Sequence, residues 1–335
     1  MVVAYKVSLA AFDQYLQELK KEYLIFAPVM LAGKGTYTDT DSIRYQEISR
    51  LSEVCFERKA SFSAKEVVLP ITQTLFYFTE DHWNEPQISD KKILLFVRSC
   101  DIHAMKRLDA MYLQNGPADP YYRALREKIH FCLMECPEQG FDNCFCVSMG
   151  TNTAAGYALF VRPAGDTVYV GVKNPALNGF AGAETLELEP DFVTENKKAV
   201  KLPAALDQQI FSSPVWQEYS SRCIGCGRCN FVCPTCSCFS MQDIFYKENR
   251  NAGERRRVWA SCMVDGYTDM AGGHGFRKTQ GDRMRFRVLH KVYDYQKRFG
   301  QPMCVGCGRC DDACPEYISF AHCLNKLSKL EEVPE

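Results

Sequence analysis

Two stretches of the sequence repeat one pattern: CIGCGRCNFVCP at residues 223–234 and CVGCGRCDDACP at residues 304–315. Each spells C-x2-C-x2-C-x3-C-P, and the two-residue gaps let three thiolates of one tight loop reach three corners of a cubane cluster. Glycines within each run allow the backbone to bend around the cluster and point N–H groups at its sulfurs. Zinc sites usually use C-x2-C pairs at longer separations and require neither the third cysteine nor the proline. The two runs therefore predict two [4Fe–4S] clusters.

The fourth cysteine of each run is expected to bind the cluster of the other run, as in two-cluster proteins with this spacing. The eight thiolates then divide into two crossed sets. The first set is Cys223, Cys226, Cys229 and Cys314, and the second is Cys304, Cys307, Cys310 and Cys233. We call the two predicted sites cluster one and cluster two.

The sequence before the runs predicts an α+β protein whose first domain, residues 1–203, is mixed α/β. Ser8 is a good N-cap for a helix, because apolar residues from Leu9 to Leu19 recur at helical spacing. Apolar runs suited to strands lie at residues 24–27, 43–48, 74–78, 93–97 and 129–134, and a β-hairpin is predicted for residues 157–172. Asp101 is expected to cap a helix over residues 102–113.

Residues 204–335 are expected to form an α-helical, ferredoxin-like domain that holds both clusters. The long segment between the runs contains helical patterns at residues 242–249 and 286–299. This segment is also rich in basic residues and faces few acids. Such a charge run is either a solvated face, a docking surface for an acidic partner, or positive charge that raises cluster potentials. Its members are Arg255, Arg256, Arg257, Arg277, Lys278, Arg283, Arg285, Arg287 and Lys291.

Composition and charge narrow the class of protein. The 335 residues are 46% hydrophobic and 24% charged, which is ordinary for a globular chain. The net charge of −1 gives no global field toward nucleic acid or an anionic membrane surface. No stretch reaches the roughly 18 uninterrupted apolar residues of a membrane span, and residues 1–22 lack the pattern of a secretory signal. We therefore expect a cytoplasmic protein with no nucleic-acid or membrane partner.

Eighteen cysteines need an explanation other than disulfides, because the cytosol keeps thiols reduced. Cys100 lies just past the carboxyl end of the predicted strand 93–97, and Cys136 just past that of strand 129–134. If the two strands are parallel neighbours, both cysteines emerge at one sheet edge, where ligand sites form. Together with the C-x-C pair Cys144 and Cys146, they could supply four thiolates to a third cluster.

Other roles for the remaining cysteines stay open at this point. Zinc is a lesser possibility for the four upstream cysteines, and free cysteines often serve as small buried hydrophobes. Cys132 lies within an apolar strand and is best interpreted that way. Cys236, Cys238 and Cys262 flank the first run and are expected to pack beside its cluster.

Motifs of other redox chemistry are absent from the sequence. No Gly-rich dinucleotide fingerprint follows a predicted strand, no P-loop occurs, and the cysteine spacing expected for sirohaem binding is missing. These absences argue against a self-contained reductase with its own flavin in the N-terminal domain, although flavin can bind without a fingerprint.

Several stretches together carry a resemblance to a known family. They are CIGCGRCNFVCPTCSCF, SCM…AGGHGFR…HK and CVGCGRCDDACP, with FSAKE at residues 62–66, RSCD at 98–101 and NCFCVSMG at 143–150. They resemble the 4Fe-4S dicluster subunit of anaerobic sulfite reductase and the related β-subunits of soluble sulfhydrogenases, over about residues 45–314. Ser99 stands where proline is expected in the sulfhydrogenase relatives, which favours the sulfite reductase assignment.

The resemblance implies an iron–sulfur electron-transfer subunit of a cytoplasmic anaerobic sulfite reductase complex, with catalysis carried out elsewhere in the complex. A flavin subunit would oxidise NADH, a sirohaem subunit would reduce sulfite, and this chain would carry electrons between them within a hetero-oligomer. Two alternatives remain: the equivalent β-subunit of a soluble hydrogenase or sulfhydrogenase, and a self-contained flavin-binding iron–sulfur reductase.

Overall fold

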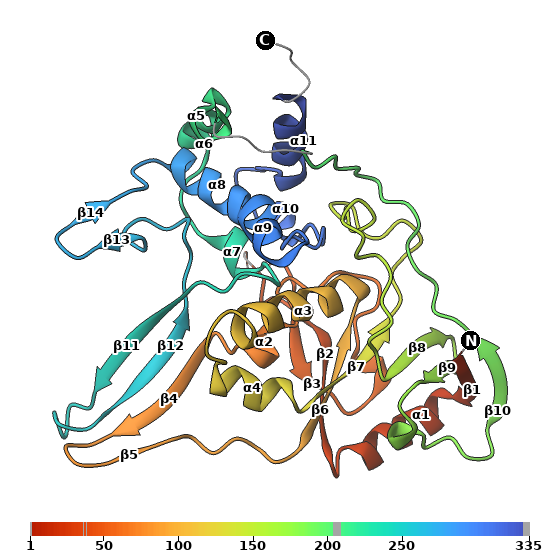
Figure 1. The fold of residues 1–335 in the computed structure, drawn as a ribbon. Coiled ribbons are helices and arrows are strands. Elements are labelled where there is room, and N and C mark those ends of the chain that lie inside the picture. The colour runs from red at the N-terminus through yellow and green to blue at the C-terminus, as the bar shows by residue number, and fades with distance from the viewer. Residues whose placement is uncertain (1, 36, 38, 204–208, 331–335) are drawn as a thin grey trace.

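The computed structural model describes residues 2–35, 37, 39–203 and 209–330. Its main body is an eight-stranded mixed sheet (Figure 1). In spatial order the strands are β10 (Glu184–Leu188), β1 (Val2–Ser8), β9 (Thr167–Val172), β8 (Leu159–Ala164), β7 (Ile129–Met134), β6 (Lys92–Val97), β2 (Tyr23–Leu31) and β3 (Ser42–Glu47). The pairs β2–β6, β6–β7 and β7–β8 are parallel, and the outer pairs are antiparallel. The predicted mixed α/β domain and its hairpin are therefore present.

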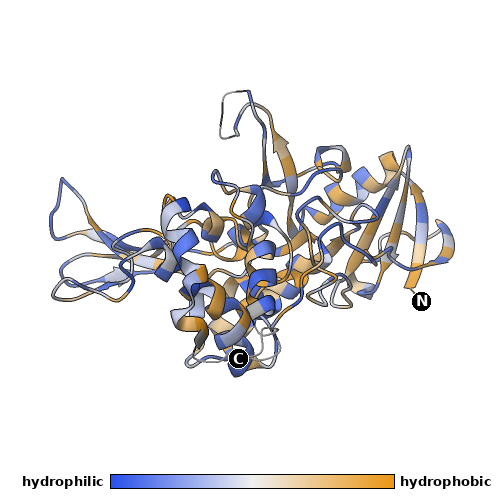
Figure 2. Cartoon of the chain, turned by 90° about the horizontal axis from the view of Figure 1, so that it is seen from above, coloured by the Kyte–Doolittle hydropathy of each residue, from blue (hydrophilic) through white to orange (hydrophobic). Residues whose placement is uncertain are grey.

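Helices cover both faces of this sheet, which explains why its central strands are apolar throughout. Alternate residues of a strand point to opposite faces. Ile93 and Leu95 of β6 pack in one core with α3 (Ser99–Leu113), and Leu94 and Phe96 pack in the other with α1 (Leu9–Leu19). Figure 2 shows the apolar residues concentrated along these strands and helices.

The ends of two helices test the predicted caps. Ser8 caps α1 as expected, since its Oγ accepts a hydrogen bond from the Ala11 amide at 3.2 Å. The prediction for Asp101 was wrong: α3 begins at Ser99 with Arg98 in the N-cap position. The Asp101 carboxylate instead forms a buried ion pair with Arg309, so a distant cation competes successfully with the local helix end.

The cysteine runs lie among helices packed above the sheet (Figure 1). These helices are α5 (Gln209–Ser212), α6 (Gln217–Arg222), α7 (Arg228–Phe231), α8 (Gln280–Leu289), a π-helical turn (His290–Asp294), α9 (Tyr295–Phe299), α10 (Arg309–Asp312) and α11 (Phe320–Leu330). Shorter elements complete the N-terminal half: α2 (Lys65–Val68), α4 (Pro120–Arg126) and 3-10 turns at Leu51–Glu53 and Pro175–Leu177. Within the described ranges, no helix combines the length and apolar character needed to cross a bilayer.

A second, four-stranded antiparallel sheet projects from the body as an arm (Figure 1). Its order is β11 (Phe239–Phe245), β12 (Gly253–Trp259), β4 (Thr72–Phe78) and β5 (Trp83–Asn84). The predicted helix over residues 242–249 was wrong, because β11 occupies the first half of that range and no helix follows in it. A small hairpin of β13 (Asp269–Met270) and β14 (His274–Gly275) follows. The part of the chain that carries the runs is therefore not purely α-helical.

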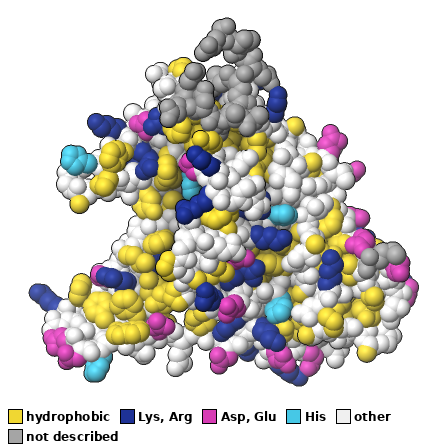
Figure 3. All heavy atoms as spheres, viewed as in Figure 1, with side chains coloured by type: hydrophobic (Ala, Val, Ile, Leu, Met, Phe, Trp, Pro, Cys, Tyr) yellow, Lys and Arg dark blue, Asp and Glu magenta, His cyan; other side chains and the backbone are white. Residues whose placement is uncertain are grey.

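The arm joins segments from both sides of the predicted boundary at residue 203, because β4 pairs with β12. The boundary itself remains a prediction. Exposed hydrophobic side chains gather on the arm (Figure 3), among them Trp83 at 67% and Phe245 at 58% exposure. The arm therefore has an apolar surface that the described part of the chain leaves exposed.

Candidate functional site

The first cysteine run forms a tight loop between two short helices. Cys223 ends α6, and Gly227 precedes α7 with φ of 74°. This left-handed conformation favours glycine, and a Cβ there would also lie 2.8 Å from Val264 Cγ2. Gly225 likewise has φ of 69°. The loop thus curls in the way the sequence argument required.

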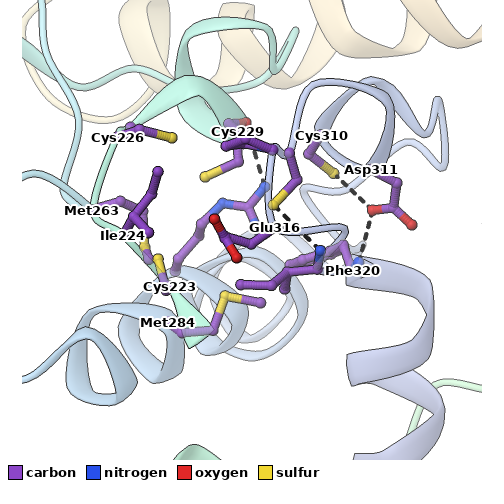
Figure 4. A pocket seen from close by; sticks show the side chains of 15 residues that line it. Cys223, Ile224, Cys226, Cys229, Met263, Met284, Cys310, Asp311, Glu316 and Phe320 are labelled. Atoms are coloured by element: carbon purple, nitrogen blue, oxygen red, sulfur yellow. Dashed lines mark hydrogen bonds between the residues drawn. The ribbon is translucent and has the colours of Figure 1, made fainter. Parts of the chain in front are cut away.

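The predicted ligands of cluster one line a single cavity. Figure 4 shows Cys223, Cys226 and Cys229 around this cavity with Cys310 across from them. Cys314, the fourth cysteine of the other run, lines it as well. The structure therefore brings together all four thiols of the first predicted set.

A second cavity contains the other predicted set. It is lined by Cys304, Cys307, Cys310 and Cys233. Each cavity thus receives three cysteines from one run and the fourth from the other, the arrangement that crossed ligation requires. Cys310 lines both cavities, so the two sites adjoin. The assignment of individual ligands remains a prediction, since Cys310 faces both sites.

Two buried cations lie beside these cavities. Arg287 and Lys291 are each 3% exposed, and among the described residues no carboxylate is within ion-pair distance of either. Arg287 lines both cavities, and its guanidinium donates to Asn230 Oδ1 at 2.9 Å. Lys291 Nζ donates to Thr235 Oγ1 at 3.1 Å. A buried charge without a counter-ion is strongly destabilising, so these residues fit a site that holds anionic, thiolate-bound clusters.

The electrostatics of the thiols agree with this fit. Burial opposes the charged form of Arg287, but the adjacent Cys229 and Cys310 raise its pKa well above the ordinary value. Burial also opposes ionisation of Cys233, yet Lys291 lowers the pKa of that thiol overall. Thiolates are the species that bind iron, so the cations favour the state of Cys233 that a cluster needs.

The four upstream cysteines also meet at one cavity. The condition set by the sequence is fulfilled, because β6 and β7 are parallel with Val97 opposite Leu133. Cys100 and Cys136 follow these strands, and both line a cavity with Cys144 and Cys146. Whether a metal occupies it remains a prediction. We call this cavity the third site.

The third site adjoins cluster two through the backbone of the second run. The Phe145 amide donates to Gly306 O at 2.8 Å, and a Cβ on Gly306 would lie 2.5 Å from Phe145 O. Lys59 Nζ donates to Cys307 O at 2.9 Å and lies 3.8 Å from Cys144 Sγ. Cys307 lines both cavities. The third site, cluster two and cluster one therefore form a continuous series.

Three thiols of the third site have raised pKa values. Burial raises the pKa of Cys100 and of Cys136, and burial followed by Cys144 raises that of Cys146 to about 12. Lys59 provides local compensation: although burial opposes its charge, Cys144 and Asp312 raise its pKa. Metal binding here would release protons, as it does wherever thiols become ligands.

Sequence reasoning did not find Lys59 or Arg309, and it treated the basic segment as short of acids. Arg309 occupies the same place in its run as Arg228, so the repeat gave no reason to expect a different role for Arg309.

The basic residues between the runs form ion pairs with acids elsewhere in the chain: Arg255 pairs with Asp243 at 2.6 Å, and Arg257 with Asp119 at 2.5 Å. The statement that this segment faces few acids was therefore wrong for Arg255 and Arg257.

Two adjoining cavities, which together contain the eight cysteines of the two runs and are both lined by the buried Arg287, define an iron–sulfur electron carrier. The family of the 4Fe-4S dicluster domain matches residues 222–318, so the cofactors are two [4Fe–4S] clusters. Over 336 residues the chain is 32% identical to sulfhydrogenase 2 subunit beta of Pyrococcus furiosus, and the match covers 94% of this chain and 96% of that protein. The chain belongs to the sulfhydrogenase β-subunit family, as the sequence resemblance indicated. No solved structure matches it.

Proposed function

We propose that this chain is the electron-transfer subunit of a multi-subunit redox complex of the sulfhydrogenase type. It would pass electrons between a flavin subunit that oxidises NADH and a terminal catalytic subunit. The observation that carries the proposal is the near full-length match to a β-subunit of a sulfhydrogenase. This match supports the alternative of the sequence analysis better than its first choice of a sulfite reductase complex.

The series of adjoining sites supports a relay role. Cys307 is common to the third site and cluster two, and Cys310 is common to cluster two and cluster one. Cys226 is exposed, so cluster one reaches the molecular surface. We propose that the third site also binds a cubane, which would give the wire two ends and two partners.

Sulfite reductase remains the second candidate, and Ser99 is the observation that favours it. Ser99 is 7% exposed, lines the third site and opens α3. Proline would fit this first turn equally well, because the first amides of a helix need no intrahelical partner. Either residue fits the fold here, so Ser99 favours sulfite reductase by the identity of the residue and not by its geometry.

Isolation of the native complex tests the proposal. The chain, tagged at its native locus, should be purified without oxygen and its co-purifying subunits identified. A flavin subunit together with a nickel-containing subunit is the expected result, and NADH should bleach the cluster absorption. Sirohaem absorption in place of nickel would assign the sulfite reductase complex. A chain that purifies alone with its own flavin bands would overturn the relay and indicate a self-contained reductase.

A further inference from the structure

Three cysteines outside the predicted ligand sets meet at the base of the arm. Cys236 and Cys238 end the loop before β11, and Cys262 follows β12. Cys238 lies beside both Cys236 and Cys262 and changes the pKa of each of these thiols. The Ala260 amide donates to Cys238 O at 3.1 Å, which fixes the two chain segments side by side. We call Cys236, Cys238 and Cys262 the neck thiols.

Cys262 is connected to cluster one through a single side chain. Asn230 directly follows the predicted ligand Cys229, and its Nδ2 donates to Cys262 Sγ at 3.1 Å. The same side chain accepts from Arg287 Nε at 2.9 Å and is itself 1% exposed. A buried amide so constrained holds the Cys262 sulfur at a fixed position beside the cluster.

The same surroundings favour the thiolate form of Cys262. The adjacent Cys238 lowers the pKa of Cys262, burial acts against this, and the hydrogen bond from Asn230 lowers it further. Two neighbouring thiols, one of them with a lowered pKa, are the arrangement from which a disulfide forms on oxidation. Cys262 is 4% exposed, so bulky oxidants in solution cannot reach it easily and the adjacent cluster is the nearest redox partner.

We propose that Cys238 and Cys262 are a redox-active dithiol–disulfide couple that exchanges two electrons with the iron–sulfur clusters. On oxidation a bond forms between Cys238 Sγ and Cys262 Sγ, both S–H bonds break, and two protons leave to solvent. The two electrons reduce two oxidised [4Fe–4S] clusters, one electron each. Reduction of the disulfide by two reduced clusters reverses every step.

The geometry favours a Cys238–Cys262 disulfide over a metal site formed by the three thiols and over a Cys236–Cys238 disulfide. Cys238 is the middle thiol of the three, and within the described ranges no three cysteine, histidine or acidic side chains converge on a point where a single metal ion could bind. Cys236 and Cys238 are separated by one residue, which strains a disulfide between them. Cys262 comes from the opposite segment, so a disulfide between Cys238 and Cys262 avoids the strain of that short loop.

A two-electron couple has a clear use in a wire of one-electron carriers. This inference rests on the proposed function. In that function the partners at either end transfer electrons in pairs, whereas each cubane carries a single electron. The neck thiols would store a pair while the clusters pass single electrons. They would also cross-link the two strands at the base of the arm when oxidised.

Peptide mapping of poised holoprotein tests the couple directly. Protein purified without oxygen should be equilibrated with mediators at a series of potentials, quenched in acid to stop exchange, unfolded and alkylated. We expect a Cys238–Cys262 cross-linked peptide in oxidised samples. Its ratio to the alkylated peptides should change tenfold for about 30 mV, the dependence of a two-electron couple.

Matched variants separate this couple from its alternatives. Cys262→Ser should abolish the cross-link and lower the electrons taken up per chain by two, with iron content and cluster EPR signals retained. Cys236→Ser should keep both. The proposal is overturned if both thiols alkylate at every potential, if the cross-link joins Cys236 and Cys238, or if zinc is bound and lost with Cys262→Ser. If the variants do not fold, the peptide map of the wild-type protein alone shows whether the Cys238–Cys262 disulfide forms. Low iron in wild-type protein would instead count against the cluster sites.

Discussion

Arg309 and Asp101, 208 residues apart in sequence, form a bidentate ion pair inside the protein. Arg309 Nη1 lies 2.8 Å from Asp101 Oδ1, and Nη2 lies 3.1 Å from Oδ2. The side chains are 3% and 1% exposed. Arg309 falls between Cys307 and Cys310, and Asp101 follows Cys100. The pair therefore fastens the third site to cluster two.

Breaking this pair should destabilise the whole protein. Asp101→Asn leaves the buried Arg309 charge without its partner, and we expect the free energy of unfolding to fall by about 3–5 kcal/mol. Denaturant unfolding of anaerobic holoprotein measures this. The double variant Asp101→Leu, Arg309→Met removes both charges and should lose less than Asp101→Asn. A change below about 1 kcal/mol in the single variant would contradict the role given to this pair.

Crossed ligation predicts that the damage from one substitution appears in the distant run. Cys233→Ala should abolish the EPR signal of cluster two, because Cys233 lines the cavity of Cys304, Cys307 and Cys310. The signal of cluster one should persist. Cys323→Ala is the matched control, since that buried thiol lines neither cavity. Selective loss of cluster one in Cys233→Ala would refute the crossed assignment.

The third site can be tested by counting iron. Two cubanes need about 8 iron atoms per chain and three need about 12. Replacing Cys144 and Cys146 together by Ala should lower iron by about 4 atoms while both C-terminal cluster signals persist. Cys132→Ala, a buried thiol of β7 outside the site, should leave the count unchanged. Reconstitution that stops at about 8 iron atoms would show the upstream cysteines to be packing residues or zinc ligands.

Arg287 should set the potentials of clusters one and two. It lines both cavities, and loss of its charge should make each cluster harder to reduce. At a separation of about 6 Å and an effective dielectric of about 20, the shift for Arg287→Met is on the order of 100 mV downward. Arg287→Lys keeps the charge and should shift the potentials much less. Redox titration monitored by EPR distinguishes the two, and unchanged potentials in Arg287→Met would contradict the prediction.

Neighbouring arginines of the arm should differ in importance despite their similar sequence context. Arg257 is 4% exposed and bonds Asp119 and Gln73, so Arg257→Ala should cost roughly 2–3 kcal/mol of stability. Arg255 pairs with Asp243 at the surface, where such pairs contribute little, and Arg255→Ala should unfold close to wild type. Equal effects of the two variants in thermal unfolding would count against this distinction.

Local spacing was enough to predict the cluster loops and the central strands. The glycines and cysteines of a run act within about a dozen residues, and a strand such as β6 is recognisable because both of its faces are buried. Local spacing was not enough to predict the order of the three sites. It depends on Cys307 and Cys310 facing two cavities each, which no spacing in the sequence reveals.

The arm shows why other predictions failed. Residues 242–249 have a helical pattern, but Phe239–Phe245 pairs along its whole length with β12, and this partner decides the structure. Asp101 is a suitable cap residue, yet Arg309 approaches from the other end of the chain. In both cases the contact that wins is long-range, and local propensity yields to it.

The cavity shared by Cys223 and Cys314 has a consequence for how the protein is made. Ribosomes add about 5–20 residues per second, so the roughly 90 residues between these cysteines take on the order of 5–20 s to synthesise. During that time the four thiols of the first run are exposed on a nascent chain. Neither cluster can be fully enclosed until the second run emerges, so iron loading should follow translation. Yield in a foreign host should then depend on the iron and sulfide supply after release from the ribosome.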